Sequence, residues 1–209
     1  MVVAVTGASG QLGQSLQFIA KNYPEITFHF YNSSELNVTD LEKCKTIFSK
    51  MKPDFCINAA AYTAVDKAEN EPEKAYSINV TGAENLAKVC KEFDTVLVHI
   101  STDFVFDGKA SKPYTEKDVP DPTGVYGQTK LDGEKAIQKI LEKHFIIRTS
   151  CVYAQFGNNF MKTMLRLGVE RDSLSIVNDQ IGTPTNAVDL AKALMTIILS
   201  YNRQPTTNN

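Results

Sequence analysis

The sequence predicts an α/β fold, a doubly wound parallel sheet covered by helices on both faces. Apolar segments of strand length alternate with segments of helix length along the chain. The first apolar run, at 2–6, is unbroken and rich in β-branched residues, which is typical of a strand buried in a parallel sheet. At 209 residues, the chain has the size of one large domain, or of one domain with a small lobe.

The alternation predicts the elements in order along the chain. The expected strands are the apolar runs 2–6, 26–31, 54–58, 95–100 and 145–149. The expected helices are 11–22, 40–51, 73–92, 127–142, 158–168 and 187–200. The segment 104–124, with its prolines and an Asp-Gly pair, is a long loop, and loops of that length are usually functional. We expect it to line a substrate cleft.

A glycine-rich turn follows the first strand, with Gly7, Gly10 and Gly13 spaced three residues apart. A strand, a glycine turn and a helix in this order let backbone N–H groups approach a pyrophosphate at the positive end of the helix. The spacing differs by one residue from the Gly-x-Gly-x-x-Gly fingerprint. A purely structural turn is the alternative, but its place at the start of the chain favours a dinucleotide site.

Polar residues follow the run at 95–100, where Ser101, Thr102 and Asp103 stand at the carboxyl end of the expected strand. Ligands of open parallel sheets bind at this edge. A hydroxyl group placed there can donate a hydrogen bond to a substrate carbonyl. The alternative is that Thr102 or Asp103 only caps the following loop.

Tyr126 and Lys130 lie four residues apart where the sequence becomes helical, so their side chains share one helix face. An ammonium group beside a phenol favours the phenolate, so the phenol gives up its proton more readily. This pair suits an enzyme that protonates an oxygen while a hydride reaches the adjacent carbon. Taken alone, the pair could be two surface residues; the glycine turn and Thr102 give it weight.

Charge and apolar content exclude several classes of partner. Lys and Arg number 22 against 24 Asp and Glu, so we expect no nucleic-acid surface. The apolar stretch 191–199 is too short and too polar to span a membrane, and no basic region precedes the N-terminal run, as it would in a signal peptide. Cys44, Cys56, Cys90 and Cys151 lack metal-site spacing. We expect reduced thiols in a cytoplasmic protein.

Several motifs together resemble those of the extended short-chain dehydrogenases, which have a Rossmann-like fold. Within that group the chain is most similar to the dTDP-4-dehydrorhamnose reductases, from residue 2 to about residue 200. The resemblance implies NAD(P)H-dependent reduction of the 4-keto group of a dTDP-6-deoxy-4-keto sugar, for cell-surface polysaccharide synthesis. Besides the glycine turn, the motifs cover 57–69, 101–108, 126–134, 148–153, 157–160 and 178–185.

The resemblance also implies roles for single residues. Tyr126 would donate the proton, Lys130 would hold the nicotinamide ribose and tune Tyr126, and Thr102 would bind the keto oxygen of the sugar. Asp103 would help to shape the sugar site. The implied cofactor contacts are Gly7, Ser9, Gly10, Gln11, Leu12 and Gly13 at the pyrophosphate, Asn37 and Val38 at the adenine, and Ala61, Tyr62 and Thr63 beside the nicotinamide.

Four features depart from the pattern of these reductases. Cys151 stands where they usually have a substrate-contacting Trp, and Phe104 replaces a frequent Tyr. Ser15 stands where some members have a Glu associated with a divalent ion, so we expect no metal. The reductases are also longer, so we expect part of the substrate lobe to be missing, from this polypeptide or from the natural protein.

The expectations divide the chain into a dinucleotide-binding domain at 1–150, a substrate-lobe segment at 151–185, and a return helix with a polar tail at 186–209. NADPH and NADH both stay open, because the run 26–31 ends without a carboxylate for the ribose diol or an Arg for a 2′-phosphate, and Glu35 lies too far along. The expected partner is a dTDP-sugar, and a homodimer stays open.

Two other functions remain beside the reductase. One is a nucleotide-sugar epimerase; a dehydratase would need a carboxylate pair after Thr102, and Phe104 occupies the second position. The other is a non-catalytic regulatory subunit resembling the methionine adenosyltransferase beta subunit, which works through binding. The intact set of Thr102, Tyr126 and Lys130 argues against that subunit, whereas Cys151 keeps it open.

Overall fold

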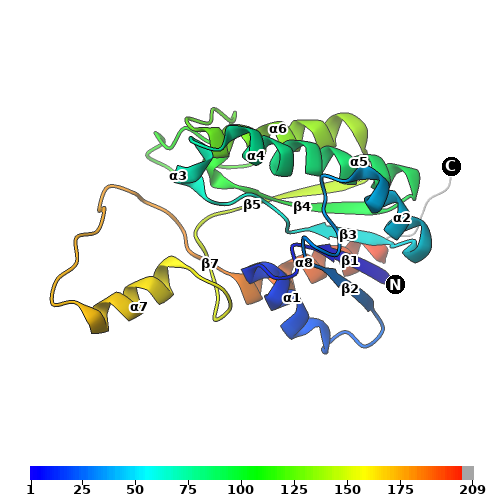
Figure 1. Cartoon of the computed structure of the whole chain (residues 1–209), viewed down its shortest axis with the longest axis horizontal. Coiled ribbons are helices and arrows are strands. Elements are labelled where there is room, and N and C mark those ends of the chain that lie inside the picture. Colours follow the sequence, from blue (N-terminus) through cyan, green and yellow to red (C-terminus); the bar gives the residue numbers. More distant parts are fainter. Residues whose placement is uncertain (204–209) are drawn as a thin grey trace.

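A five-stranded parallel sheet, with the strand order β2-β1-β3-β4-β5, forms the centre of the computed structural model, which describes residues 1–203 (Figure 1). This confirms the expected α/β fold, and each strand lies within two residues of its expected bounds. The polar tail expected after the last helix lies mostly outside the described residues. The strands are β1 (Val2–Thr6), β2 (Thr27–Tyr31), β3 (Phe55–Asn58), β4 (Val96–Thr102) and β5 (His144–Thr149).

Helices cover both faces of the sheet and bury a separate apolar core on each (Figure 1). Because successive strand residues point to opposite faces, Val3 and Val5 of β1 belong to one core and Ala4 to the other. The helices of the first layer are α1 (Gln11–Ala20) and α8 (Ala187–Asn202). Those of the second layer are α2 (Leu41–Met51), α5 (Gly82–Glu92) and α6 (Val125–Ile140).

The helix expected at 73–92 is divided in three. α4 (Pro72–Tyr76) runs into a π-helical turn, Ser77–Thr81, which leads into α5. Asn79 lies buried in that turn. Its amide accepts from the backbone N–H of Tyr62 at 2.9 Å and donates to Thr129 Oγ1 at 3.1 Å. Turns of this kind are frequent at functional sites, and this one ties the loop after β3 to α6.

One segment stands apart from the two helix layers. α7 (Phe160–Glu170) buries no residue and lies well away from the sheet (Figure 1). Two short strands, β6 (Val152–Tyr153) and β7 (Thr185–Asn186), pair in parallel and close the loop that carries it. Neither short strand was expected, nor was the four-residue helix α3 (Val65–Ala68). Within residues 1–203, no helix is long and apolar enough to cross a bilayer.

The contact between α6 and the π-helical turn generates the first prediction. A Cβ at Gly133 would lie 2.3 Å from the carbonyl oxygen of Asn79, so Gly133→Ala must push the two segments apart. We expect it to lower the free energy of unfolding by about 1–3 kcal/mol, measured in urea. Gly168→Ala in α7 is the matched control, because its Cβ would meet nothing within 4 Å. Equal stability of the two variants would contradict the close approach.

Candidate functional site

A cavity of about 860 Å³ runs along the carboxyl ends of the strands, the edge at which doubly wound sheets bind their ligands. Of the residues expected at the site, Gly7, Ser9, Gly10, Gln11, Leu12, Gly13, Asn37, Val38, Ala61, Thr63, Thr102, Asp103, Tyr126, Lys130 and Cys151 line it. Segments far apart in the sequence therefore meet around one space.

The glycine turn brings backbone very close to backbone. Gly7 has a φ of +69°, and a Cβ there would lie 2.5 Å from the carbonyl carbon of Ala59. A Cβ at Gly13 would lie 2.4 Å from the oxygen of Gly7. Gly10 caps α1 without a side-chain hydrogen bond, and the first turn of α1 holds no acidic residue. The free N–H groups of α1 can therefore receive an anion such as a pyrophosphate.

The loop after β2 is fixed by one bond from α5 and one within the loop. Asn85 Nδ2 donates to the carbonyl oxygen of Val38 at 3.1 Å, and Asn37 Oδ1 accepts from the N–H of Thr39 at 3.1 Å. Glu35 does not line the cavity, because its carboxylate accepts from the N–H of Asn32 at 2.9 Å. Among the described residues that line the cavity, Asp103 at the opposite end is the only carboxylate.

Tyr62 departs from its expected place. Its neighbours Ala61 and Thr63 line the cavity, but its own side chain packs against Tyr126. The Tyr62 hydroxyl donates to Glu71 Oε2 at 3.1 Å, so its polar end is turned to that carboxylate. Tyr62 therefore does not line the cavity, and its contact with the cofactor stays a prediction.

Thr102 and Asp103 form one hydrogen-bonded unit at the end of β4. Thr102 Oγ1 donates to Asp103 Oδ1 at 3.0 Å and also accepts from the N–H of Phe104. Ser150 Oγ donates to the other carboxylate oxygen of Asp103 at 2.6 Å. The alternative of a loop cap is thus also realised, but both side chains still line the cavity.

Tyr126 and Lys130 are both buried, and burial decides their pKa values. Burial raises the pKa of Tyr126, while its hydrogen bond with Thr102 works in the opposite direction. Burial lowers the pKa of Lys130 to about 8, against the attraction of Glu134. Lys130 Nζ donates to the carbonyl oxygen of Ile100 at 2.7 Å. The expected lowering of the Tyr126 pKa by Lys130 is therefore not seen, because the amine is bonded to β4 instead.

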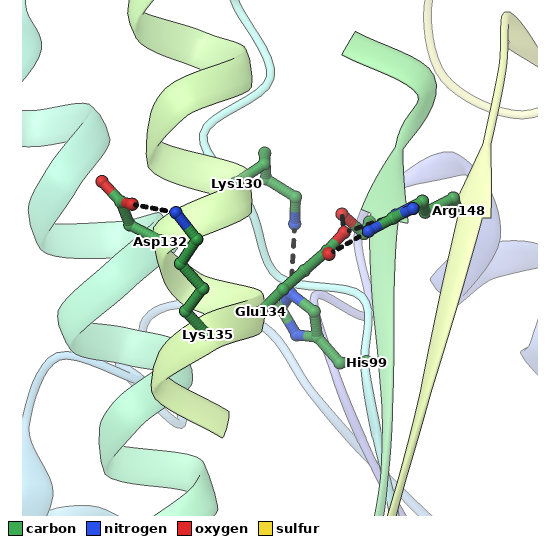
Figure 2. A network of polar contacts seen from close by, with 7 residues as sticks. His99, Lys130, Asp132, Glu134, Lys135 and Arg148 are labelled. Atoms are coloured by element: carbon green, nitrogen blue, oxygen red, sulfur yellow. Dashed lines mark hydrogen bonds and ion pairs between the residues drawn. The ribbon is translucent and has the colours of Figure 1, made fainter. Parts of the chain in front are cut away.

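An ion pair between the half-buried Arg148 and the buried Glu134, next to this site, was not predicted from the sequence. Arg148 of β5 donates twice to Glu134 of α6, at 3.0 and 2.7 Å, and Ser101 also donates to Glu134 (Figure 2). Arg148 also lies over the ring of Phe106, 5.1 Å from its centre. The sequence did contain a signal for this pair. Glu134 is the last residue of the motif 126–134, and Arg148 is the first residue of the motif 148–153. The pair fixes α6 to the end of the sheet.

The expected substrate segments contribute unequally to the cavity. From the loop 104–124, only Phe104 lines it, with its ring 5.5 Å from that of Tyr126. Phe106 of this loop instead stacks on Tyr114 and belongs to a small apolar cluster with Leu131 of α6. Cys151 lines the cavity with an exposed side chain and a φ of +43°. Residues 159–184, including all of α7, contribute nothing to the lining.

No group of His, Cys, Asp and Glu side chains within residues 1–203 is arranged to hold a metal ion. Ser15, at the position where some reductases have a Glu, is buried and donates to the carbonyl oxygen of Gln11 at 2.8 Å. The absence of a metal in the working protein stays a prediction.

Comparison with known proteins gives consistent results over nearly the whole chain. The family model described as the RmlD substrate binding domain matches residues 1–209. A dTDP-4-dehydrorhamnose reductase of Aggregatibacter actinomycetemcomitans is 44% identical over 193 residues, which are 92% of this chain and 66% of that protein. The reductase of the same name from Escherichia coli K12 is 46% identical, over 91% of this chain and 64% of its own length.

A solved structure is similarly close. The dTDP-4-dehydrorhamnose reductase of Bacillus anthracis, in complex with NADP, superposes with a TM-score of 0.92 at 40% identity. The match covers 95% of this chain and 70% of that one. This chain thus spans slightly less than two thirds of the length of the curated relatives.

His99, next to Lys130, generates a prediction about acid stability. Burial and the nearby Lys130 hold the pKa of His99 well below its ordinary value of 6.5. Below about pH 6.5 the unfolded chain therefore binds a proton that the folded chain does not, and the free energy of unfolding falls as the pH falls. His99→Phe should flatten this slope by up to about 1.4 kcal/mol per pH unit, measured by urea unfolding between pH 5 and 7. Equal slopes would show that His99 takes up its proton in the folded state.

Proposed function

The chain belongs to the RmlD substrate binding domain family, and on that basis we propose that it reduces the 4-keto group of a dTDP-6-deoxy-4-keto sugar with NAD(P)H. The product would be dTDP-L-rhamnose, a precursor of cell-surface polysaccharide. The supporting observation is that the glycine turn and the set Thr102, Tyr126 and Lys130 line one cavity. The curated relatives carry the name of this reductase.

A dinucleotide fits the first half of the cavity. Side chains at Gly7 and Gly13 would fill the space where backbone approaches backbone, and the N–H groups of α1 face the cavity without a side-chain partner. The loop of Asn37 and Val38 provides a wall for the adenine. The bound nicotinamide would supply the hydride to the sugar carbon.

The remaining chemistry belongs to side chains of this protein. Tyr126 carries a raised pKa, so it keeps its proton at neutral pH and can donate it to the oxygen formed at C4. Thr102 would turn its hydroxyl proton from Asp103 to the keto oxygen and so place this oxygen near the phenol. Lys130, which lines the cavity, would hold the nicotinamide ribose. Asp103 and Cys151 contact the sugar.

For the cofactor, we propose a preference for NADPH. A carboxylate at the end of β2 would bind the ribose diol of NAD and repel a 2′-phosphate. Here that place is lined by Ser33, and Glu35 is engaged with the backbone of Asn32. Lys43 lies close by, with its Nζ 2.9 Å from the carbonyl oxygen of Ser34. The Bacillus anthracis relative contains NADP.

The domain division and the setting are part of the same proposal. Residues 1–150 would form the dinucleotide-binding domain, 151–185 a substrate-lobe segment and 186–209 the return helix with its tail. The nucleotide cofactor and nucleotide-sugar substrate suit the cytoplasm. NADPH oxidation, followed by absorbance with and without the keto sugar nucleotide, separates the reductase from an epimerase and from a regulatory subunit. Of the three, only the reductase consumes NADPH in proportion to the sugar.

Tyr126→Phe is the direct test of the proton donor. The change removes the hydroxyl but keeps the ring that packs against Phe104 and Tyr62. We expect turnover to fall by about 10²–10⁴-fold, because the alkoxide then lacks its general acid. NADPH affinity, measured by fluorescence titration, should change little. A fully active Tyr126→Phe protein would remove Tyr126 from the mechanism.

Ligand affinities provide a second test. α7 and the residues after it expose Phe160, Leu165 and Val169 and do not line the cavity, so the sugar end is less enclosed than the cofactor end. We therefore expect calorimetric titration to show binding of NADPH but weak binding of the sugar nucleotide, and slow reduction, unless a partner covers this segment. Tight sugar-nucleotide binding with full turnover would mean that the sugar site lies elsewhere.

A further inference from the structure

A row of buried polar side chains crosses the sheet beneath Lys130 and takes no part in the proposed chemistry. Thr6 of β1, Asn58 of β3 and His99 of β4 are each at most 2% exposed. Thr6 Oγ1 lies 2.7 Å from Asn58 Oδ1, Asn58 Nδ2 lies 3.0 Å from His99 Nδ1, and Lys130 Nζ lies 3.4 Å from His99 Nε2. Figure 2 shows the last of these contacts, with the His99 ring pointing at the Lys130 amine.

The bonds of Asn58 determine where the proton of His99 sits. Asn58 Oδ1 accepts from the N–H of Ala60 at 3.2 Å as well as from Thr6, so this atom must be the oxygen. The NH₂ group of Asn58 therefore faces the ring and donates to Nδ1. An Nδ1 that accepts a hydrogen bond carries no proton, so the neutral ring carries its proton on Nε2.

The Nε2–H of His99 then points at the nitrogen of Lys130. An ammonium would place its own N–H groups against this donor, whereas an uncharged amine offers a lone pair to it. The two nitrogens lie 3.4 Å apart, so the Nε2–H of the ring directly faces the amine nitrogen. Burial lowers the pKa of Lys130 to about 8 against the attraction of Glu134. An N–H that faces the amine nitrogen also disfavours the ammonium.

We propose that Asn58 and His99 are positioning residues for Lys130, which fix the place of its Nζ and favour its uncharged form. This inference rests on the proposed function, in which Lys130 holds the cofactor ribose. A lysine that exists in both forms near neutral pH can donate to a ribose hydroxyl in either form. The protonation state of Lys130 can then change when Tyr126 donates its proton.

The other ionisable groups around Lys130 are few, and each has a defined partner. On α6 they are Tyr126, one turn before Lys130, and Glu134, one turn after it, which raises the Lys130 pKa. Arg148 of β5 pairs with the same carboxylate. Asp103, after β4, is bonded to Thr102 and Ser150. β1 and β3 contribute only the neutral side chains of Thr6 and Asn58.

Nuclear magnetic resonance on the ligand-free 209-residue chain tests the ring directly. The ¹⁵N chemical shifts of a histidine distinguish a protonated from an unprotonated ring nitrogen. His99→Phe assigns the signals, since the chain has only three histidines. We expect the proton of His99 on Nε2 at pH 7. A proton on Nδ1 would overturn the proposal.

Asn58→Asp tests the effect on Lys130. The carboxylate can still accept from Thr6 and Ala60, but it must also accept from Nδ1–H, which moves the proton and turns Nε2 into an acceptor. We expect the pKa of Lys130 to rise by about one unit, read from the ¹³Cε signal that disappears in Lys130→Met. An unchanged pKa would overturn the proposal.

A double variant distinguishes the effect of the His99 ring on the Lys130 pKa from the direct effect of the new carboxylate. In Asn58→Asp combined with His99→Phe, the new carboxylate remains but the ring can no longer pass on its effect. The rise in the Lys130 pKa should then be smaller than in Asn58→Asp alone. A rise of the same size would assign the effect to charge and refute the role of the ring. The ¹⁵N shifts and the Lys130 pKa are both measured without substrate or cofactor. Both results could therefore be interpreted even if the protein had no reductase activity.

Discussion

Two charged side chains on one helix, both taken out of water, govern how this protein is assembled around its cavity. Lys130 and Glu134 lie one turn apart on α6 and are at most 2% exposed. A buried charge is tolerated only where partners surround it. β4 and β5 supply these partners through the carbonyl oxygen of Ile100, Ser101 and Arg148. α6 can therefore dock on the sheet in one register only, and this register places Tyr126 beside Thr102.

Close backbone contacts strengthen the same constraint. A Cβ at Gly127 would lie 2.1 Å from the carbonyl oxygen of Phe104, so glycine lets the first turn of α6 approach the end of β4. Glu69 accepts from the N–H of Val125 at 2.8 Å and so caps α6 from the loop after β3. The helix is held at its start, along its buried face and against the π-helical turn. These contacts hold the Tyr126 phenol and the Thr102 hydroxyl, which come from different elements, beside the same cavity.

The sequence predicted the sheet and most of the cavity because these depend on local patterns. The unbroken apolar runs gave the strands, and the glycine spacing indicated the turn at Gly7, where only a residue without a side chain fits against Ala59. What escaped prediction depends on contacts between distant segments. The side chain of Tyr62 turns toward Glu71, and Lys130 bonds to β4 rather than to Tyr126, because burial and neighbouring acceptors decide these orientations. The π-helical turn covers only five residues between two helices, which is too short for the pattern of apolar residues to reveal it.

The parallel pairing of β6 with β7 has a consequence for how this fold can change. Val152 pairs with Thr185 and Tyr153 with Asn186, so the chain leaves and re-enters the body of the protein at neighbouring points. The residues between β6 and β7 form a loop whose two ends are held together by this pairing. Loops of this kind tolerate insertion and deletion at little entropic cost. The segment 160–184, which does not line the cavity, can therefore vary in length and sequence. Sequence changes in this segment can alter the outer surface of the protein without changing the buried polar residues beneath α6.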